Sequence, residues 1–206
     1  MTEEACHFAF AETKEQTNSR YWSFLRYGRV TASNLYAVAH SKIESGGVLK
    51  EMILGASTLK LTEAMSRGQN LEQSVVKIVE KKMNVQIDKV GIKLSHDLPE
   101  FGASPDGLTN EFVVEVKCPR NSKTFSNYVR NGCITPKFMA QVQLQMKMCG
   151  KSRALFCVAH TDFESSKEVT VLHINFDASL IDELISTARQ YWENHIFPVL
   201  ISAAHK

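Results

Sequence analysis

The chain has 206 residues, of which 44% are hydrophobic and 22% are charged, and its formal net charge is +2. This composition is typical of one globular domain with a full core, and it excludes a disordered or fibrous chain. No apolar run approaches the ~20 residues that a membrane-spanning helix needs, and the acidic N-terminus lacks the apolar segment of a signal peptide. We therefore expect a single intracellular domain over residues 1–206, in the cytoplasm or nucleus and with no membrane partner, in which residues 1–18 are a candidate peripheral segment.

One short helix and a loop are predicted before residue 62. Thr31 or Ser33 is a suitable cap for a short helix that runs through Val38, and the glycine-containing stretch 41–47 is predicted to be a loop. Residues 62–83 are predicted to form a long helix, because apolar side chains recur along one side of it, at Leu71, Val75, Ile78 and Val79.

Strands and helices then alternate. Residues 85–94 alternate between apolar and polar side chains, with a slip near Asp88 that indicates a bulge or turn, so they are predicted to form a strand. Two more strands, a helix, two strands and a last helix are predicted at residues 101–104, 112–117, 136–149, 153–160, 168–176 and 177–192. The order α-β-β-β-α-β-β-α predicts a mixed α/β fold, in which helices flank a central mixed sheet.

Charged side chains come together in two neighbouring segments, Ser104-Pro-Asp-Gly107 and Val114-Glu-Val-Lys117. Glu115 and Lys117 are two residues apart, so on a strand they point to the same face, while the two valines point to the other. Together with Asp106, they are suited to hold a hard divalent cation and to position a water for attack on phosphate. Taken alone, the same residues also fit an ordinary turn followed by a strand with an exposed ion pair.

Two helices carry polar residues that fit the same site. Glu72 lies at the margin of the apolar side of the long helix, and its alternative is a solvated glutamate. Gly68, one turn earlier, destabilises a helix by ~1 kcal/mol relative to alanine, which indicates a close approach by another group. Gln141 and Gln145 lie one turn apart on helix 136–149, although glutamines also fit the wet side of an amphipathic helix.

Five motifs occur in the order found in a known family. They are LRYGRVTAS at residues 25–33, GQNLE at 68–72, FGASPDGL at 101–108, VEVKCP at 114–119 and MAQVQ at 139–143. With these motifs the chain resembles the lambda-exonuclease-type, YqaJ-like viral recombinase family of alkaline exonucleases, within the PD-(D/E)xK nuclease superfamily. The resemblance extends over residues 21–197. It implies a restriction-endonuclease-like core and a metal-dependent deoxyribonuclease, namely a 5′-to-3′ exonuclease on duplex DNA ends with a role in DNA recombination or degradation.

The resemblance also implies roles for single residues. Metal ligation is implied for four groups, the side chains of Asp106, Glu115 and Glu72 and the carbonyl of Val116. Because all of these ligands are oxygens, Mg²⁺ is the expected metal and Mn²⁺ its substitute. Lys117 would orient the attacking water or stabilise charge on the scissile phosphate, and Gln141 would hold the lysine or the water.

A second set of residues, Arg26, Ser33 and Ser104, matches the positions that bind a terminal 5′-phosphate in the family. Lys123 and Arg120 follow the catalytic strand, and we expect them to contact DNA phosphates. The expected partners are duplex DNA ends, further copies of the chain in a homotrimer, and a single-strand annealing protein. Two alternatives stay open: an endonuclease on the same core, and a DNA-binding or recombination module without catalytic activity.

Overall fold

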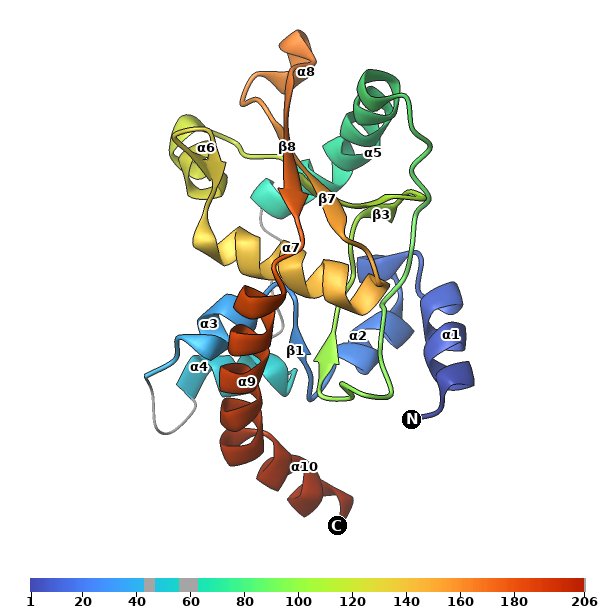
Figure 1. Cartoon of the computed structure of the whole chain (residues 1–206), viewed down its shortest axis with the longest axis vertical. Helices are drawn as coiled ribbons and strands as arrows, with labels where there is room; N and C mark the ends of the chain where they lie inside the picture. Colours follow the sequence, from blue (N-terminus) through green and yellow to red (C-terminus); the bar gives the residue numbers. More distant parts are fainter. Residues whose placement is uncertain (43–46, 56–62, 206) are drawn as a thin grey trace.

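The computed structural model describes residues 1–42, 47–55 and 63–205 of the chain. At its centre is a four-stranded sheet in the order β3-β4-β7-β8, formed by β3 (Gly107–Leu108), β4 (Phe112–Lys117), β7 (Arg153–Ala159) and β8 (Val169–Asn175) (Figure 1). β4 and β7 are parallel, whereas the outer strands pair antiparallel with their neighbours. The predicted fold class, a mixed sheet flanked by helices, is confirmed.

A long helix covers each face of this sheet. α5 (Glu63–Met83) packs its apolar side on the face that carries Val114, and α7 (Pro136–Cys149) packs on the opposite face, which carries Val113. Because successive side chains of a strand alternate between faces, Glu115 lies on the α7 face together with Val113. The polar residues of α7 can therefore reach it.

A second core lies beside the first and is mainly helical. α7 contributes apolar residues to both cores, so it joins the sheet to this layer. The other elements of the second core are β1 (Val30–Thr31), α3 (Leu35–Ala39), α4 (Gly47–Ile53), β2 (Phe101–Gly102) and α9 (Ala178–His195). β1 and β2 form a short parallel pair at one end of the sheet region (Figure 1).

The N-terminal segment consists of α1 (Glu3–Glu12), η1 (Gln16–Asn18) and α2 (Arg20–Arg26). Thr13, between α1 and η1, is fully buried. Its Oγ1 accepts the backbone N–H of Ile92 at 2.8 Å and donates to the carbonyl of Ala9 at 2.6 Å. This contact fixes the end of α1 on the segment that leads to β2 and to the turn of Asp106.

Residues 85–94 do not form the predicted strand, and this prediction was wrong. They make only isolated bridges, at Asp88 and Lys93. Their alternating apolar side chains are buried against helices instead, since Ile87 packs with the α5 residues and Ile92 packs with the α1 residues. Burial of every second residue therefore arose here without strand pairing.

Several local details differ from the sequence-based predictions. The cap of α3 is Asn34 rather than Thr31 or Ser33, whose hydroxyls lie 3.1 Å apart. Part of the predicted loop, at 43–46, lies outside the described residues. Eleven elements were not predicted, namely α1, η1, α2, β1, α4, β3, α6 (Ser122–Tyr128), β5 (Val129–Arg130), β6 (Cys133–Ile134), α8 (Phe163–Ser166) and α10 (Phe197–Ala204). Apart from α1, which has ten residues, none is longer than eight residues, too short for a helical or strand period to stand out.

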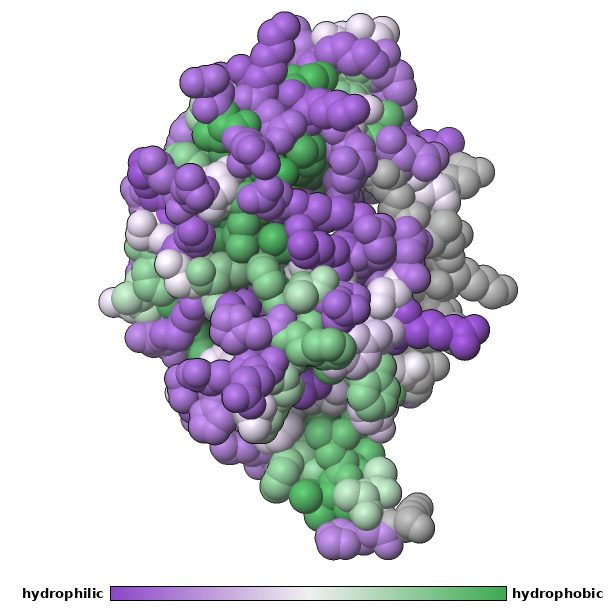
Figure 2. Space-filling view, turned by 90° about the vertical axis from the view of Figure 1, so that its right-hand side faces the viewer, coloured by the Kyte–Doolittle hydropathy of each residue, from purple (hydrophilic) through white to green (hydrophobic). Residues whose placement is uncertain are grey.

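The C-terminal helix α10 projects from the body and exposes apolar side chains. Phe197 is 45% exposed and Ile201 is 43% exposed. Figure 2 shows hydrophobic residues gathered on this projecting end. Only its inner side packs on the body, where Leu200 lies against Gly28. Within the described residues, no helix combines the length and apolar character needed to cross a membrane.

Candidate active site

The turn before β3 places Asp106 beside β4. Oδ2 of Asp106 accepts the backbone N–H of Val116 at 2.6 Å, which ties the turn to the strand. The following residue, Gly107, has no room for a side chain, since a Cβ would lie 2.3 Å from Cγ2 of Ile87. One oxygen of Asp106 is thereby fixed, while Oδ1 accepts no hydrogen bond from the described part of the chain.

Glu115 is only 2% exposed and is surrounded by donors. Its Oε1 accepts from Nζ of Lys117 and from Nε2 of Gln141, both at 2.5 Å, and its Oε2 accepts from Nε2 of Gln145 at 2.6 Å. A buried carboxylate without partners is strongly unfavourable, and these three donors stabilise its charged form. Gln141 therefore contacts Glu115 itself, the carboxylate that also holds Lys117.

Lys117 is held as an ammonium group. Burial by itself would lower its pKa, but the carboxylates of Glu115 and Asp106 outweigh burial and raise the pKa above the usual value. Its Nζ also lies 5.3 Å from the ring centroid of Phe138, a cation–π distance. At neutral pH, Lys117 can thus donate hydrogen bonds and stabilise negative charge, but it is poorly suited to take up a proton.

Glu72 of α5 lies near enough to Glu115 and Asp106 for their charges to interact. Burial raises the pKa of Glu72, and the charge of Glu115 raises it further. Burial likewise raises the pKa of Asp106 well above its usual value, with added contributions from Glu115 and Glu72. The negative charge of Glu115 therefore opposes the ionisation of Glu72 and Asp106, and nearby lysines offset this only in part. A bound divalent cation would remove the opposition.

The donor set fits a hard cation that keeps water ligands. Among the residues that the structure describes, no three acidic, imidazole or thiol side chains converge into a complete set of metal ligands. Mg²⁺, however, is usually bound through one or two carboxylates and retains several waters. Asp106, with Oδ1 unbonded, and Glu115 can supply these carboxylates, so the residues present are compatible with Mg²⁺ and not with a closed structural zinc site.

Trp22 brings two of the predicted phosphate-binding residues together. Its ring lies 4.2 Å from Cζ of Arg26, and its Nε1 donates to Oγ of Ser104 at 2.8 Å. Burial lowers the pKa of Arg26 to about 10, which still leaves the guanidinium charged at neutral pH. Among the described residues, no carboxylate forms an ion pair with it. Arg26 is therefore a desolvated cation without a described counter-ion.

Strand pairing brings the third of these residues, Ser33, toward the same place. Thr31 of β1 pairs with Gly102 of β2, and the N–H of Ala32 donates to the carbonyl of Gly102 at 2.9 Å. Ser33 and Ser104 each follow two residues after this parallel pair. The predicted phosphate-binding residues thus gather at one end of β1 and β2, next to the turn of Asp106.

The remaining predicted DNA contacts lie farther out. Lys123, in α6, and Arg120, in the loop before it, are exposed beyond the end of β4 and not part of the cluster around Glu115. Gly68 belongs to α5, but an added Cβ there would meet no described atom within 4 Å. The described structure therefore gives no packing reason for this glycine.

Comparison with known proteins identifies the family. Residues 21–152, more than half of the chain, match the YqaJ-like viral recombinase domain. The chain belongs to this family. The family predicted from the five motifs is thus confirmed. No protein with a curated description matches the sequence.

Solved structures share the fold of this YqaJ-like chain. An alkaline exonuclease (LHK-Exo) from Laribacter hongkongensis is 26% identical, with a TM-score of 0.75, and the similarity covers 91% of this chain and 99% of that one. Its complex with dAMP gives a TM-score of 0.76 at the same identity and coverage. A phage-related exonuclease from Haemophilus somnus 129PT is 16% identical, with a TM-score of 0.58 and coverages of 85% and 96%. The restriction-endonuclease-like core expected from the resemblance agrees with these structures.

Two residues of the site, Trp22 and Gln16, were not singled out from the sequence, and Gln145 was named beside Gln141 but given no role. Gln145 holds Oε2 of Glu115, and its position one turn after Gln141 was a usable signal. Trp22 connects Arg26 with Ser104. The sequence pattern that could have indicated this role was only an aromatic residue four positions before an arginine. Gln16 precedes the YqaJ-like match, which begins at residue 21, so no motif pointed to it.

Gln16 supports the turn of Asp106 directly. Its Nε2 donates to the carbonyl of Pro105 at 2.8 Å and to the carbonyl of Val90 at 3.1 Å. Its backbone is left-handed, with φ +43°, a conformation that costs free energy in residues other than glycine. The two hydrogen bonds stabilise this conformation and fix the residue that precedes Asp106.

Proposed function

We propose that this YqaJ-like chain is a metal-dependent deoxyribonuclease that digests duplex DNA from a 5′ end, as a 5′-to-3′ exonuclease in DNA recombination or degradation. The observation that carries the proposal is the buried cluster of Asp106, Glu115 and Lys117 at the end of β4. Two buried carboxylates next to a retained ammonium group are suited to hydrolysis of a phosphodiester with a divalent cation. In this proposal residues 1–206 act as one nuclease domain.

Mg²⁺, or Mn²⁺ in its place, is the proposed metal, because the donor groups are all oxygens. When bound, it stabilises charge on the scissile phosphate and lowers the pKa of a bound water. The proposed ligands are Asp106, Glu115 and the carbonyl of Val116, and Glu72 completes the site from α5.

The other residues prepare the site for the phosphate. Lys117 donates to the negative oxygens of the scissile group, a task for which its raised pKa is favourable. Gln141 and Gln145 hold both oxygens of Glu115 from α7, so this carboxylate needs little reorganisation during the reaction.

The polarity is proposed from the second cluster. A guanidinium fork and two hydroxyls suit a terminal phosphate, and Arg26 has no described carboxylate to compete with it. Ser104 precedes Asp106 by two residues, so a phosphate bound there would bring the next phosphodiester close to the carboxylates. Lys123 and Arg120 are proposed to contact the DNA backbone farther along.

Relatives support DNA as the substrate. LHK-Exo is an alkaline exonuclease and was solved with dAMP. A SOX protein that shares the fold, at 12% identity and a TM-score of 0.61, was solved with DNA.

We also infer that the chain associates with itself, as a homotrimer, and with a single-strand annealing protein. The exposed apolar side chains of α10 support a contact with another polypeptide. Sedimentation over a range of concentrations tests the trimer, and a monomer at every concentration would remove it.

The central test is digestion of end-labelled linear duplex and of closed circular duplex, each with Mg²⁺ or with EDTA. Shortening of the linear DNA alone, only with Mg²⁺, is the expected result. Cutting of circles would favour the endonuclease, and no cleavage of either would favour the inactive DNA-binding module.

The 5′-end pocket has its own test. Wild-type protein should degrade 5′-phosphorylated duplex faster than 5′-hydroxyl duplex, and Arg26→Ala should remove this preference. Arg130→Ala, which changes an exposed arginine of β5, is the control and should keep it. Equal rates of the wild type on both ends would contradict the pocket and leave the nuclease proposal standing.

A further inference from the structure

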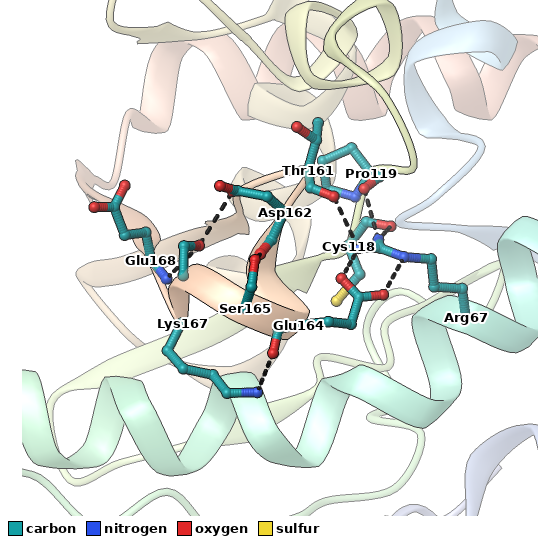
Figure 3. Close-up of polar contacts among 10 residues, drawn as sticks. Arg67, Cys118, Pro119, Thr161, Asp162, Glu164, Ser165, Lys167 and Glu168 are labelled. Carbon is teal, nitrogen blue, oxygen red and sulfur yellow. Dashed lines mark hydrogen bonds and ion pairs between the residues drawn. The ribbon is translucent and has the colours of Figure 1, made fainter.

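The side chain of Arg67, in α5, donates hydrogen bonds to described segments outside its own helix (Figure 3). Its Nε and Nη2 donate to the carboxylate of Glu164 at 2.9 and 2.6 Å. Its Nη1 donates to the carbonyls of Pro119 and Cys118 at 2.6 and 3.2 Å, and its Nη2 also donates to the carbonyl of Thr161 at 3.3 Å. These five contacts match the five N–H donors of a guanidinium.

The acceptors belong to two separate parts of the fold. Cys118 and Pro119 directly follow Lys117 at the end of β4, whereas Thr161 and Glu164 lie in the turn between β7 and β8. The Arg67 side chain is only 17% exposed whereas that of Glu164 is 54% exposed, so the contacts with the backbone carbonyls are better shielded from water than the ion pair. One side chain therefore ties α5 to the end of the catalytic strand and to the β7–β8 turn.

The β7–β8 turn is itself well ordered by internal contacts. Phe163 is fully buried and anchors it. The N–H groups of Ser165 and Ser166 both donate to the carbonyl of Asp162 at 2.9 Å, and Nζ of Lys167 donates to the carbonyl of Glu164 at 2.8 Å (Figure 3). Glu164 is thus presented to Arg67 by a preformed turn rather than by a loose loop.

We propose that Arg67 is a positioning residue for the metal site, which holds α5 against the end of β4 so that Glu72 stays beside Asp106 and Glu115. The proposal rests on the proposed function, since it assigns a role in metal binding. Glu72 follows Arg67 by five residues, about 7.5 Å along the helix axis, so a shift of α5 at Arg67 would move Glu72 with little attenuation. The Arg67 contacts with the end of β4 and with the β7–β8 turn oppose such a shift.

Matched variants separate this role from general support of α5. Lys82 lies on the same helix and its Nζ donates to the carbonyl of Val169 in β8 at 3.1 Å. It is ten residues beyond Glu72, about 15 Å along the axis, so Lys82→Ala weakens the contact of α5 with β8 far from the metal site. Glu164→Ala removes the ion pair with the turn and leaves the carbonyls of Cys118, Pro119 and Thr161 for Arg67.

The experiment measures the Mg²⁺ concentration at half-effect in two ways, as the rise in melting temperature without DNA and as cleavage of linear duplex. Arg67→Ala should raise both midpoints about 10- to 100-fold, the usual effect of removing a residue that orients metal ligands. Lys82→Ala should change them by less than about twofold, and Glu164→Ala should fall between the two. KM for DNA should stay unchanged, because Arg67 is not proposed to contact DNA.

Amide hydrogen exchange in EDTA provides a readout that needs no metal. Arg67→Ala should speed exchange over residues 66–76 of α5, and Lys82→Ala should not. If Arg67→Ala does not fold, Arg67→Lys, which keeps the charge but not the planar fork, replaces it and should still raise both Mg²⁺ midpoints.

Three outcomes would overturn the proposal. They are unchanged Mg²⁺ midpoints in folded Arg67→Ala or Arg67→Lys, an equal shift in Lys82→Ala, and unchanged exchange of α5. A different result would contradict the proposed function, namely a wild-type protein that does not cleave DNA and whose melting temperature does not rise with Mg²⁺. The role of Arg67 in metal binding would then fall as well. The exchange experiment would still decide whether Arg67 holds the helix.

Discussion

The hydrogen bond between Gln145 and Glu115 provides a quantitative test of how the site is built. Gln145→Met removes the donor to Oε2 of Glu115 and keeps a side chain of similar length. A hydrogen bond to a charged group contributes about 1.5–3 kcal/mol, so its loss should destabilise the protein. The same substitution also removes Oε1 of Gln145, a buried oxygen without a hydrogen-bond partner among the described residues. Loss of this unpaired oxygen should stabilise the protein. The single substitution therefore combines two opposing effects.

A double-mutant cycle separates these effects. Gln145→Met, Glu115→Met and the double variant are unfolded in urea with EDTA present, and the free energies of unfolding are compared at equal m-values. The stabilisation from removing the unpaired oxygen of Gln145 contributes equally to the free energy of unfolding with Glu115 present and with Glu115 replaced, so it cancels in the coupling energy. The coupling should be about 1.5–3 kcal/mol, which corresponds to a departure from additivity of roughly 3–12 °C in melting temperature for a chain of this size.

Gln143 supplies the control cycle on the same helix. Its Nε2 donates to the carbonyl of Asn175, and its Oε1 accepts the N–H of Asp177, each at 2.8 Å, so it does not hold Glu115. Gln143→Met and Glu115→Met should be additive to within about 0.5 kcal/mol. If the Gln145 cycle is equally additive, Gln145 does not stabilise the Glu115 carboxylate and the described geometry does not govern its energetics.

Three further predictions concern the same site. Asp106→Asn should abolish cleavage and yet raise the melting temperature in EDTA at neutral pH. Burial and the nearby carboxylates raise the pKa of Asp106 in the folded state, so its ionised form destabilises the fold above that pKa. The rise in melting temperature should therefore shrink as the pH falls through the pKa of folded Asp106. A melting temperature that does not respond to this substitution at any pH would show that the carboxylates do not repel one another. Lys117→Arg should keep the Mg²⁺-dependent rise in melting temperature but lower kcat by at least ~10²-fold, because a planar fork cannot replace a compact ammonium group; normal turnover with weakened DNA binding would contradict this role. Gly68→Ala should raise the melting temperature by about 2–4 °C, because a methyl group meets no described atom there and alanine is favoured in a helix by ~1 kcal/mol; if cleavage falls although stability rises, the space at Gly68 serves the substrate.

Long periodic elements could be predicted from the sequence, and short ones could not. Helix 136–149 was correct at both ends, because proline and glycine mark them. β4 was also correct, since its residues are nearly all buried by helices on both faces. Residues 85–94 carried the alternation of a strand, but this pattern reports burial of every second side chain and not strand pairing. Which surface covers that side, another strand or a helix, depends on the tertiary fold.

The same distinction applies to the site. Asp106, Glu115 and Lys117 could be proposed from spacing, because a turn and one strand connect them directly. Gln145 could have been included, since it shares a helix side with Gln141. No local pattern, however, relates Gln16 to the carbonyl of Pro105, a contact between residues 89 positions apart. Contacts of this kind are set by the fold and are visible only in the structure.

These distant contacts have a common physical reason. The proposed site holds Glu72 and Asp106 near Glu115, although the charge of Glu115 opposes the ionisation of both. Neutral amides and a helix held in place can provide this restraint without neutralising the negative charge that would bind the proposed metal. Gln145 restrains Glu115, Gln16 fixes the residue before Asp106, and Arg67 fixes the helix of Glu72. Arg67 directs its own positive charge to Glu164 and to backbone carbonyls, away from the cluster, so Lys117 remains the cation at Glu115 that is available to the phosphate.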